Sequence, residues 1–291
     1  MGVPNIFLRA LSPCFVFRPD IFARACWRRL RPRPEKCLAR TAWGDLLEIE
    51  PRRLIGAHIY MRGVHELAVC EVLWRLAGSG EQVVDVGANI GVMTSMLSRR
   101  VGMEGRVVAF EPHPVLYRRL ERNVQRWTRP NVLLFNSAVS SQNGHAMLSE
   151  HDGFAGNNGI ASLSVTNATN TSFGVRTLRL DDALPDGNWA VLKIDVEGHE
   201  LEVLNGAETF LARTQFRDII FESDFPSPVH QLLGRNGFSI YELSAGFSGP
   251  KLRGARAQGQ RADYLATREP ARARELIEPS GWNVLRSRVL R

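Results

Sequence analysis

Residues 83–91 read Val-Val-Asp-Val-Gly-Ala-Asn-Ile-Gly, and residues 108–112 read Val-Ala-Phe-Glu-Pro. In each stretch an apolar run typical of a buried parallel strand carries an acid near its end, Asp85 in the first and Glu111 in the second. Open α/β sheets bind their ligands just beyond the carboxyl ends of the strands. A carboxylate ending the second strand suits the two hydroxyls of a ribose, because each oxygen can accept a hydrogen bond. The pair therefore predicts a site for a nucleoside-containing cofactor.

Strand and helix patterns alternate outward from this pair. Alternation of this kind predicts a Rossmann-like, doubly wound α/β sheet that is mostly parallel, with an antiparallel finish and a small N-terminal cap. The predicted strands are 46–50 and 54–60 in the cap, then 82–86, 106–110, 131–135, 175–180, 190–195, 218–222, 238–243 and 262–267, and the predicted helices are 65–77, 90–100, 114–126, 199–212 and 227–235.

Four sections of the chain are expected to differ in role. They are a basic N-terminal extension (1–40), a cap with the first helix (41–77), the main domain (78–268) and a basic C-terminal tail (269–291). The formal net charge of +7 comes from the two ends, and the centre is mildly acidic. A cleft built around nucleic acid is therefore not expected.

The N-terminal extension interleaves aromatic and aliphatic residues with arginines. We favour a basic segment that is poorly ordered or packs on the domain, and the alternative is peripheral contact with an anionic membrane. No stretch approaches the roughly 20 apolar residues of a membrane span, and no signal peptide is recognisable. The four cysteines form no C-x-x-C pair, so a reducing, cytoplasmic environment and no zinc are expected.

The glycine turn after the first strand discriminates between cofactors. A dinucleotide fingerprint would read G-x-G-x-x-G, but Asn89 stands where its second glycine would be, between Gly87-Ala88 and Gly91. Asp85 would repel a diphosphate and would suit the positively charged methionyl end of S-adenosylmethionine. Residues 136–139, with Ala138 among them, follow the third strand and could meet an adenine edge.

A dense run of charge, Lys-Ile-Asp-Val-Glu-Gly-His-Glu, ends the fourth strand at residues 193–200. Asp195, Glu197 and His199 are candidates to hold or deprotonate an acceptor. For Glu197 and Glu200, acids favoured by a helix N-terminus are the alternative interpretation.

Glu222 ends the fifth strand and is a further catalytic candidate. We expect no bound metal; a divalent cation held by Asp195, Glu222 and Asp224 is the alternative. Tyr60, His65 and Glu66 precede the cofactor turn and could cover the site, or they could simply begin a helix.

Taken together, these motifs closely resemble the FkbM family of S-adenosylmethionine-dependent methyltransferases. The resemblance covers about residues 41–245 and includes Val-Leu-Asn-Gly-Ala at 203–207. It implies a seven-stranded class I methyltransferase sheet and methyl transfer, usually to a hydroxyl of a sugar, polyketide or other secondary metabolite. It assigns the cofactor to Asp85, Gly87, Asn89 and Glu111, and it matches Asp195 and Glu197 to the strand-four motif. We also expect Ala88, Gly91, Pro112, Ala138 and Asp195 to contact the cofactor.

The predicted function is O-methylation of a hydroxyl on a sugar, glycolipid, polysaccharide or secondary metabolite, with Asp195 or His199 as the general base. The alternatives are a nucleotide- or NAD-binding oxidoreductase, a non-catalytic module that keeps the fold, and a methyltransferase acting on nucleic acid or protein. The expected partner is a small-molecule or glycan acceptor.

Overall fold

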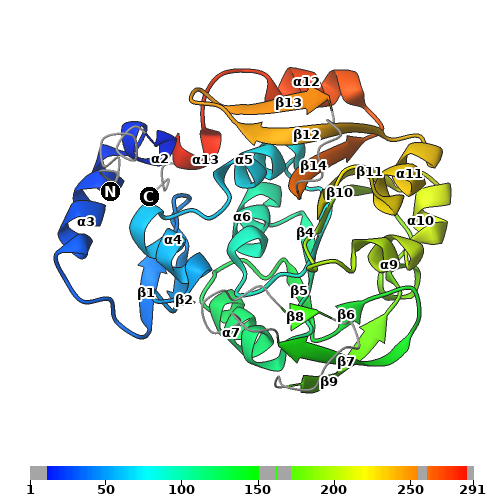
Figure 1. Ribbon diagram of the computed structural model, residues 1–291, viewed down its shortest axis with the longest axis horizontal. Helices are drawn as coiled ribbons and strands as arrows, with labels where there is room; N and C mark the ends of the chain where they lie inside the picture. The colour runs from blue at the N-terminus through cyan, green and yellow to red at the C-terminus, as the bar shows by residue number, and fades with distance from the viewer. Residues whose placement is uncertain (1–11, 151–160, 163–171, 255–260, 287–291) are drawn as a thin grey trace, which may run out of the picture.

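A computed structural model describes residues 12–150, 161–162, 172–254 and 261–286. Its centre is an eight-stranded sheet with the order β13-β12-β14-β11-β10-β3-β4-β5 (Figure 1). The strands are β3 (Gln82–Val86), β4 (Arg106–Phe110), β5 (Val132–Phe135), β10 (Trp189–Ile194), β11 (Phe216–Ser223), β12 (Ser239–Ala245), β13 (Pro250–Gly254) and β14 (Ala262–Thr267).

The predicted fold class is confirmed. Strands β5, β4, β3, β10 and β11 are parallel to one another, and β14 runs antiparallel between β11 and β12. The sheet has one strand more than the seven that the resemblance implies. This strand, β13, pairs antiparallel with β12 and begins at Pro250, a residue that sheets tolerate on an edge.

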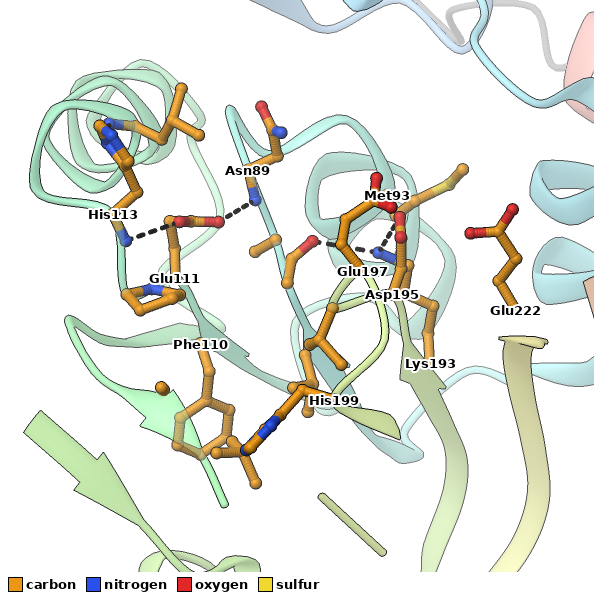
Figure 2. Close-up of a pocket in the computed structure, with 18 of the residues that line it drawn as sticks. Asn89, Met93, Phe110, Glu111, His113, Lys193, Asp195, Glu197, His199 and Glu222 are labelled. Carbon is orange, nitrogen blue, oxygen red and sulfur yellow. Dashed lines mark hydrogen bonds and ion pairs between the residues drawn. The ribbon is translucent and has the colours of Figure 1, made fainter. Parts of the chain in front are cut away.

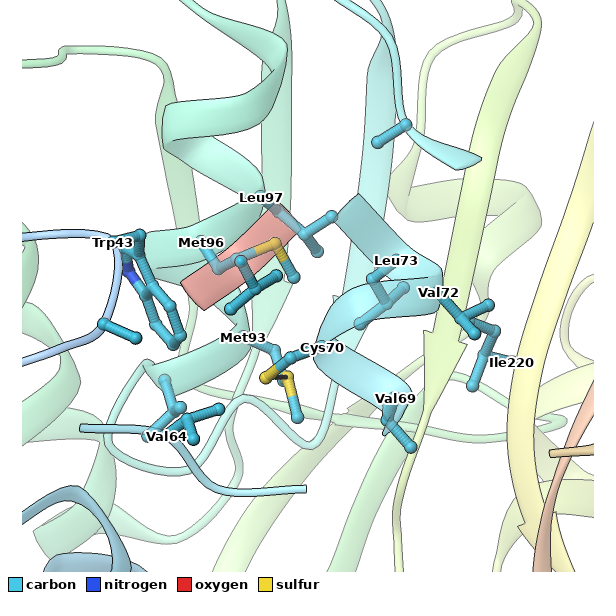
Figure 3. Packing of buried hydrophobic residues seen from close by; sticks show 14 of the residues in the cluster. Trp43, Val64, Val69, Cys70, Val72, Leu73, Met93, Met96, Leu97 and Ile220 are labelled. Carbon is cyan, nitrogen blue, oxygen red and sulfur yellow. Dashed lines mark hydrogen bonds between the residues drawn. The ribbon is translucent and has the colours of Figure 1, made fainter. Parts of the chain in front are cut away.

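Helices cover both faces of the sheet because neighbouring strand residues point to opposite sides. Val83, Val107 and Val191 pack in one cluster with α5 (Leu67–Leu76) and α6 (Val92–Val101). Val84, Val108 and Leu192 pack in a second cluster, on the side of α9 (Glu200–Asn205), α10 (Glu208–Ala212) and α11 (Pro228–Arg235). Figure 3 shows the first cluster, where Cys70 and Leu73 of α5 meet Met93, Met96 and Leu97 of α6. The helix between β4 and β5 is α7 (Pro114–Gln125).

The prediction of a strand at 54–60 is wrong, because this segment is the helix α4 (Leu54–Arg62). Its buried residues include Ile55 and Ile59, four positions apart, which places them on one helical face. Gly63 ends the helix in the left-handed conformation. The predicted cap strand 46–50 is confirmed as β2 (Leu46–Ile49), and its antiparallel partner β1 (Cys37–Arg40) was not predicted.

The helix predicted at 199–212 is divided into α9 (Glu200–Asn205) and α10 (Glu208–Ala212). The carboxylate of Asp181, in the short helix α8 (Leu180–Ala183), accepts hydrogen bonds from the backbone N–H groups of Thr209 and Phe210. A side chain distant in sequence thus satisfies the first N–H groups of α10, and the chain starts a new helix there.

The polar stretch after β5 contributes a second, four-stranded sheet with the order β6-β9-β7-β8. Its strands are β6 (Ala138–Val139), β7 (Gly144–Glu150), β8 (Ala161–Ser162) and β9 (Ser172–Leu178). The last of them overlaps the strand predicted at 175–180. Residues 151–160 and 163–171 lie outside the described residues.

Both ends of the described chain pack near α4 and α5. The N-terminal helix α2 (Pro13–Val16) packs on α3 (Pro19–Arg29), and α3 lies beside α4. At the other end, α12 (Pro270–Ile277) and α13 (Asn283–Arg286) lie beside α5 (Figure 1). Arg18 of the N-terminal section donates to the carbonyl of Leu285 at 3.2 Å. Among the described residues, no helix is both long and apolar enough to cross a membrane.

Candidate functional site

A pocket of about 380 Å³ opens at the carboxyl ends of β3, β4 and β10 (Figure 2). Its size suits a small-molecule ligand or cofactor. Ten of the predicted site residues line it: Gly87, Ala88, Asn89, Glu111, Pro112, Ala138, Asp195, Glu197, His199 and Glu222. Two others, Asp85 and Gly91, lie outside its lining.

Glu111 is fixed at one end of the pocket by two backbone hydrogen bonds. Its Oε2 accepts from the N–H of Asn89 at 2.7 Å, and its Oε1 accepts from the N–H of His113 at 2.8 Å. Burial raises the pKa of Glu111 to about 7, although both hydrogen bonds act in the opposite direction. Because each oxygen keeps a further lone pair, the carboxylate can accept two hydroxyls side by side.

The turn between β3 and α6 needs unusual backbone conformations. Gly87 has φ +78°, and Asn89 has φ +53° while its Oδ1 accepts from the N–H of Ile90. Asparagine tolerates this left-handed region better than most side chains, so it can stand where a dinucleotide fingerprint would have its second glycine. A Cβ on Gly91 would collide with Leu120 of α7, so this glycine serves helix packing and not the pocket.

Asp85 lies beneath the pocket and is fully buried. Its Oδ2 accepts from the hydroxyl of Thr94 at 2.6 Å, and its Oδ1 lies 3.4 Å from the ammonium of Lys193. The same ammonium donates to the carbonyl of Gly87 at 3.1 Å and lies 3.3 Å from Oδ2 of Asp195. Asp85 therefore acts on the pocket through Lys193.

Lys193 keeps its charge despite its burial. Burial by itself lowers the pKa of Lys193, but Asp195, Asp85 and Glu66 outweigh it and hold the pKa above its usual value. The lysine thus links the cofactor turn to the end of the fourth strand, where Asp195 lines the pocket.

Acidic side chains gather at the end of the pocket opposite Glu111. In Figure 2, Asp195 and Glu197 lie side by side, with Glu222 on the next strand. Glu197 adopts φ +54°, and burial together with the carboxylate of Asp195 raises its pKa to about 7. Glu197 can therefore exchange a proton near neutral pH.

Arg261 is the counter-charge of this acidic end. It precedes β14, and its guanidinium lies 2.8 Å from Glu222, 3.3 Å from Glu200 and 3.6 Å from Glu197. Asp224, considered as a metal ligand together with Asp195 and Glu222, is exposed and does not line the pocket. Within the described parts of the chain, no group of three or more His, Cys, Asp or Glu side chains is arranged to hold a metal ion.

His199 lies nearer Phe110 than the acidic pair does (Figure 2). Its Nε2 is 3.0 Å from the hydroxyl of Ser140, and burial lowers its pKa, so the ring is neutral at pH 7. Its position precedes α9 directly.

Two of the three residues suggested as a cover for the site line the pocket. They are His65 and Glu66, whereas Tyr60 does not contribute to the lining. The Nε2 of His65 lies 3.2 Å from Glu66, and its Nδ1 lies 2.8 Å from Nδ1 of His58 in α4. The contact between His58 and His65 thus connects the cap helix α4 to the lining of the pocket.

Sequence reasoning missed several pocket residues. Lys193 had a signal, since it is the one charged residue in the strand Trp-Ala-Val-Leu-Lys-Ile and strands of this kind are buried on both faces. Arg261 had none, because it is one of many arginines near the C-terminus. Leu54 of α4 and Leu148 of β7 come from outside the main sheet, and only the tertiary fold brings them to the pocket.

A Rossmann-like sheet with a fixed carboxylate after its second strand defines a nucleoside-binding α/β protein of the class I methyltransferase type. The family model described as "Methyltransferase FkbM domain" matches residues 85–240. The chain therefore belongs to the FkbM family of S-adenosylmethionine-dependent methyltransferases. The predicted family and its cofactor are thereby confirmed, and the NAD-binding alternative is set aside.

Individual relatives are more distant. The chain is 32% identical over 154 residues to "Hexuronic acid methyltransferase AglP" of Haloferax volcanii, which covers 52% of this chain and 60% of that protein. It is 29% identical over 192 residues to "Methyltransferase sdnD" of Sordaria araneosa, covering 54% and 73%. The fibrillarin structure from Aeropyrum pernix is 16% identical, with a TM-score of 0.40 over 81% of this chain and 84% of that one.

The pocket fits the family's cofactor. Glu111 offers two oriented acceptors for ribose hydroxyls, and Ala138, Val139 and Leu148 provide an apolar wall for an adenine ring. Asp195, whose side chain is 36% exposed, offers a carboxylate for the positively charged methionyl end.

Proposed function

We propose that this protein transfers a methyl group from S-adenosylmethionine to a hydroxyl of a sugar, glycolipid, polysaccharide or secondary metabolite. The proposal rests on one observation above the others. A single continuous pocket joins Glu111, suited to a ribose, with the charged cluster of Asp195, Glu197, Glu222 and Arg261. Such a pocket can hold cofactor and acceptor together.

The cofactor supplies a methyl group on a positively charged sulfur that is already a good leaving group. The chain's own residues then have two tasks, which are to align the acceptor oxygen and to receive its proton. Glu111 anchors the cofactor end. Asp195 and Glu222 offer carboxylate oxygens that can accept hydrogen bonds from acceptor hydroxyls.

We assign Glu197 as the general base that receives the proton of the acceptor hydroxyl. Its pKa of about 7 suits a general base near neutral pH, and Arg261 at 3.6 Å stabilises its ionised form. Asp195 is less suitable because Lys193 occupies one of its oxygens. His199 is less suitable because its Nε2 is paired with Ser140, at a distance from the carboxylates.

The similarity to a protein named hexuronic acid methyltransferase supports a sugar acceptor. The chemistry of the pocket agrees, since several carboxylates and one guanidinium can bind a polyhydroxylated molecule through many hydrogen bonds. An acidic sugar would in addition bring a carboxylate that Arg261 can pair with.

The test has two stages. Calorimetry should detect S-adenosylhomocysteine binding and no NAD binding. Transfer of labelled methyl from S-adenosylmethionine should then be measured with neutral sugars, uronic acids and hydroxylated metabolites, and Glu197→Gln should lower the turnover by about a hundredfold or more without weakening S-adenosylhomocysteine binding. NAD binding without S-adenosylhomocysteine binding, or methylation of RNA in preference to every hydroxyl acceptor, would contradict the proposal.

A further inference from the structure

The helix α3 buries only a narrow side. Ile21 and Ala25, 3% and 4% exposed, are its buried residues, and the helix packs on α4. The opposite side is apolar throughout. At 3.6 residues per turn, its members fall within a sector of about 140°. They are Pro19, Phe22, Ala23, Cys26, Trp27 and Leu30, and all six are exposed.

This exposed apolar sector, Pro19 to Leu30, is too continuous to be ordinary surface. Phe22 is 41% exposed, Trp27 54% and Leu30 86%. Single exposed apolar side chains are common, but a contiguous patch marks a surface that binds something apolar. Phe15 of α2 extends the patch, with its ring 5.5 Å from that of Phe22.

Arginines border the sector on both sides. By helical position Arg24 lies along one flank and Arg29 along the other. Arg31 follows the end of the helix, and its guanidinium lies 3.9 Å from the centre of the Trp27 ring. Residues 12–36 carry seven Lys and Arg against two acids. Asp20 pairs with Arg24 at 3.0 Å, whereas no acid in the described part of the chain lies within ion-pair distance of Arg29 or Arg31.

We propose that α3 docks this protein on an anionic lipid surface, with the exposed apolar sector inserted among the acyl chains and the arginines at the phosphate level. An apolar face with Trp, Phe and Leu between basic flanks is the pattern of helices that lie in a membrane interface. A second copy of the chain fits less well, because a twofold contact would bring the arginine borders of two helices together.

The docking helix is close to the pocket in the fold. Arg28 donates to the carbonyl of Tyr60 in α4, and Leu54 and Ile55 at the start of α4 line the pocket. Figure 1 shows α3 at the edge of the molecule, with α4 between it and the main sheet. The inference goes beyond the proposed function and does not depend on it.

Flotation of the full chain with lipid vesicles tests the proposal. Vesicles of phosphatidylcholine alone are compared with vesicles that also contain phosphatidylglycerol. The wild type should float with the anionic vesicles and stay behind with the neutral ones. The triple variant F22S/W27S/L30S should bind the anionic vesicles at least about tenfold more weakly than the wild type. In R29Q/R31Q, the ratio of the affinity for anionic vesicles to that for neutral vesicles should fall about tenfold. Met103→Ser, a matched change at an apolar residue that is 62% exposed, should bind like the wild type.

Folding is checked independently by far-ultraviolet circular dichroism and thermal unfolding, which should be the same in all four proteins. The proposal is overturned if the wild type ignores anionic vesicles, or if the triple variant floats as well as the wild type. Sedimentation equilibrium tests the alternative that a second copy of the chain covers the sector. If the wild type is a dimer, the triple variant is a monomer and neither binds vesicles, the sector is a dimer interface. Absence of S-adenosylhomocysteine binding would contradict the proposed function and leave this result unchanged.

Discussion

The backbone carbonyl of Asp195 occupies the place where a Cβ of Gly87 would stand, closer than the 3.0 Å that real Cβ contacts keep. The cofactor turn after β3 and the charged end of β10 therefore touch through the main chain. A side chain at position 87 would push the two apart and shift Asp195, so the glycine sets the width of the pocket between the two strands.

This contact predicts different effects for two glycines with nearly the same backbone. Gly87 has φ +78° and Gly80 has φ +80°, but nothing lies within 4 Å of a Cβ on Gly80. We expect Gly80→Ala to lower the free energy of unfolding by about 1 kcal/mol, from backbone strain alone. Gly87→Ala should cost at least about 2 kcal/mol more, because it also collides with Asp195. Urea denaturation measures both, and equal losses would contradict the interpretation.

The second prediction concerns Lys193. Lys193→Met removes the charge that lies between Asp85 and Asp195 and leaves a fully buried carboxylate without its cation. We expect a loss of about 3 kcal/mol in the free energy of unfolding. The control is Lys251→Met at an exposed position, which should change stability by less than about 0.5 kcal/mol. A Lys193 variant as stable as this control would argue against the ion-pair network.

The third prediction concerns Glu111. Glutamine at this position would present its NH₂ group to one of two backbone N–H groups, those of Asn89 and His113, and would lose the bond there. We expect S-adenosylhomocysteine affinity to fall by about 2 kcal/mol, or about thirtyfold. Calorimetry measures this loss against the exposed control Glu104→Gln, whose affinity should equal that of the wild type.

The fourth prediction is a pH dependence from Asp263, which pairs in register with Glu222. Burial and the carboxylates of Glu66, Glu222 and Asp195 raise the pKa of Asp263 from 3.8 to about 7. A raised carboxyl pKa means that the fold prefers the protonated form, so its stabilising contribution is present below pH 4 and is lost as the pH rises to 7. Asp263→Asn cannot ionise.

We therefore expect the Asp263→Asn variant to exceed the wild type in free energy of unfolding at pH 8, by about 2 kcal/mol, with the difference vanishing near pH 4. Guanidinium denaturation at several pH values measures this difference. Asp186→Asn, at a side chain 80% exposed, is the control and should show no such trend. A wild-type advantage at pH 8 would reverse the assigned sign.

The fifth prediction concerns the C-terminal helices. Arg75 of α5 donates to the carbonyls of Leu276, Ile277, Pro279 and Gly281, and Glu71 accepts from the N–H groups of Asn283 and Val284. Arg75→Met breaks its buried ion pair with Glu71 and should cost about 3 kcal/mol. Limited proteolysis should then cut within 270–286 much faster.

The matched control is Arg213→Met, because Arg213 forms an exposed ion pair with Asp186. Exposed pairs contribute about 0–1 kcal/mol, so this variant should keep the wild-type cleavage pattern. Unchanged proteolysis of the Arg75 variant would show that α12 and α13 are held by their apolar contacts alone.

The division of the chain at residues 40, 77 and 268 stays a prediction.

Local signals predicted the main sheet well. Strands such as 82–86 and 106–110 were found because apolar runs bounded by glycine and acids leave few alternatives. The helix α4 was misread because an apolar segment of this length, Leu-Ile-Gly-Ala-His-Ile-Tyr, fits a strand as readily as a helix. The break between α9 and α10 could not be read locally, since Asp181 supplies the hydrogen bonds from outside that segment.

The sequence by itself determined the family, where most of the central strands lie along the chain and which residues end them, because each of these depends on motifs of a few consecutive residues. Only the tertiary structure decided which acids face the pocket. Asp85 and Asp195 follow similar apolar runs, and both carboxylates lie near the ammonium of Lys193. Asp85 is nevertheless fully buried, whereas the side chain of Asp195 is exposed in the pocket. That difference depends on the register of β3 against β10 and on the position of Lys193 between the two carboxylates. Neither can be predicted from a short stretch of sequence.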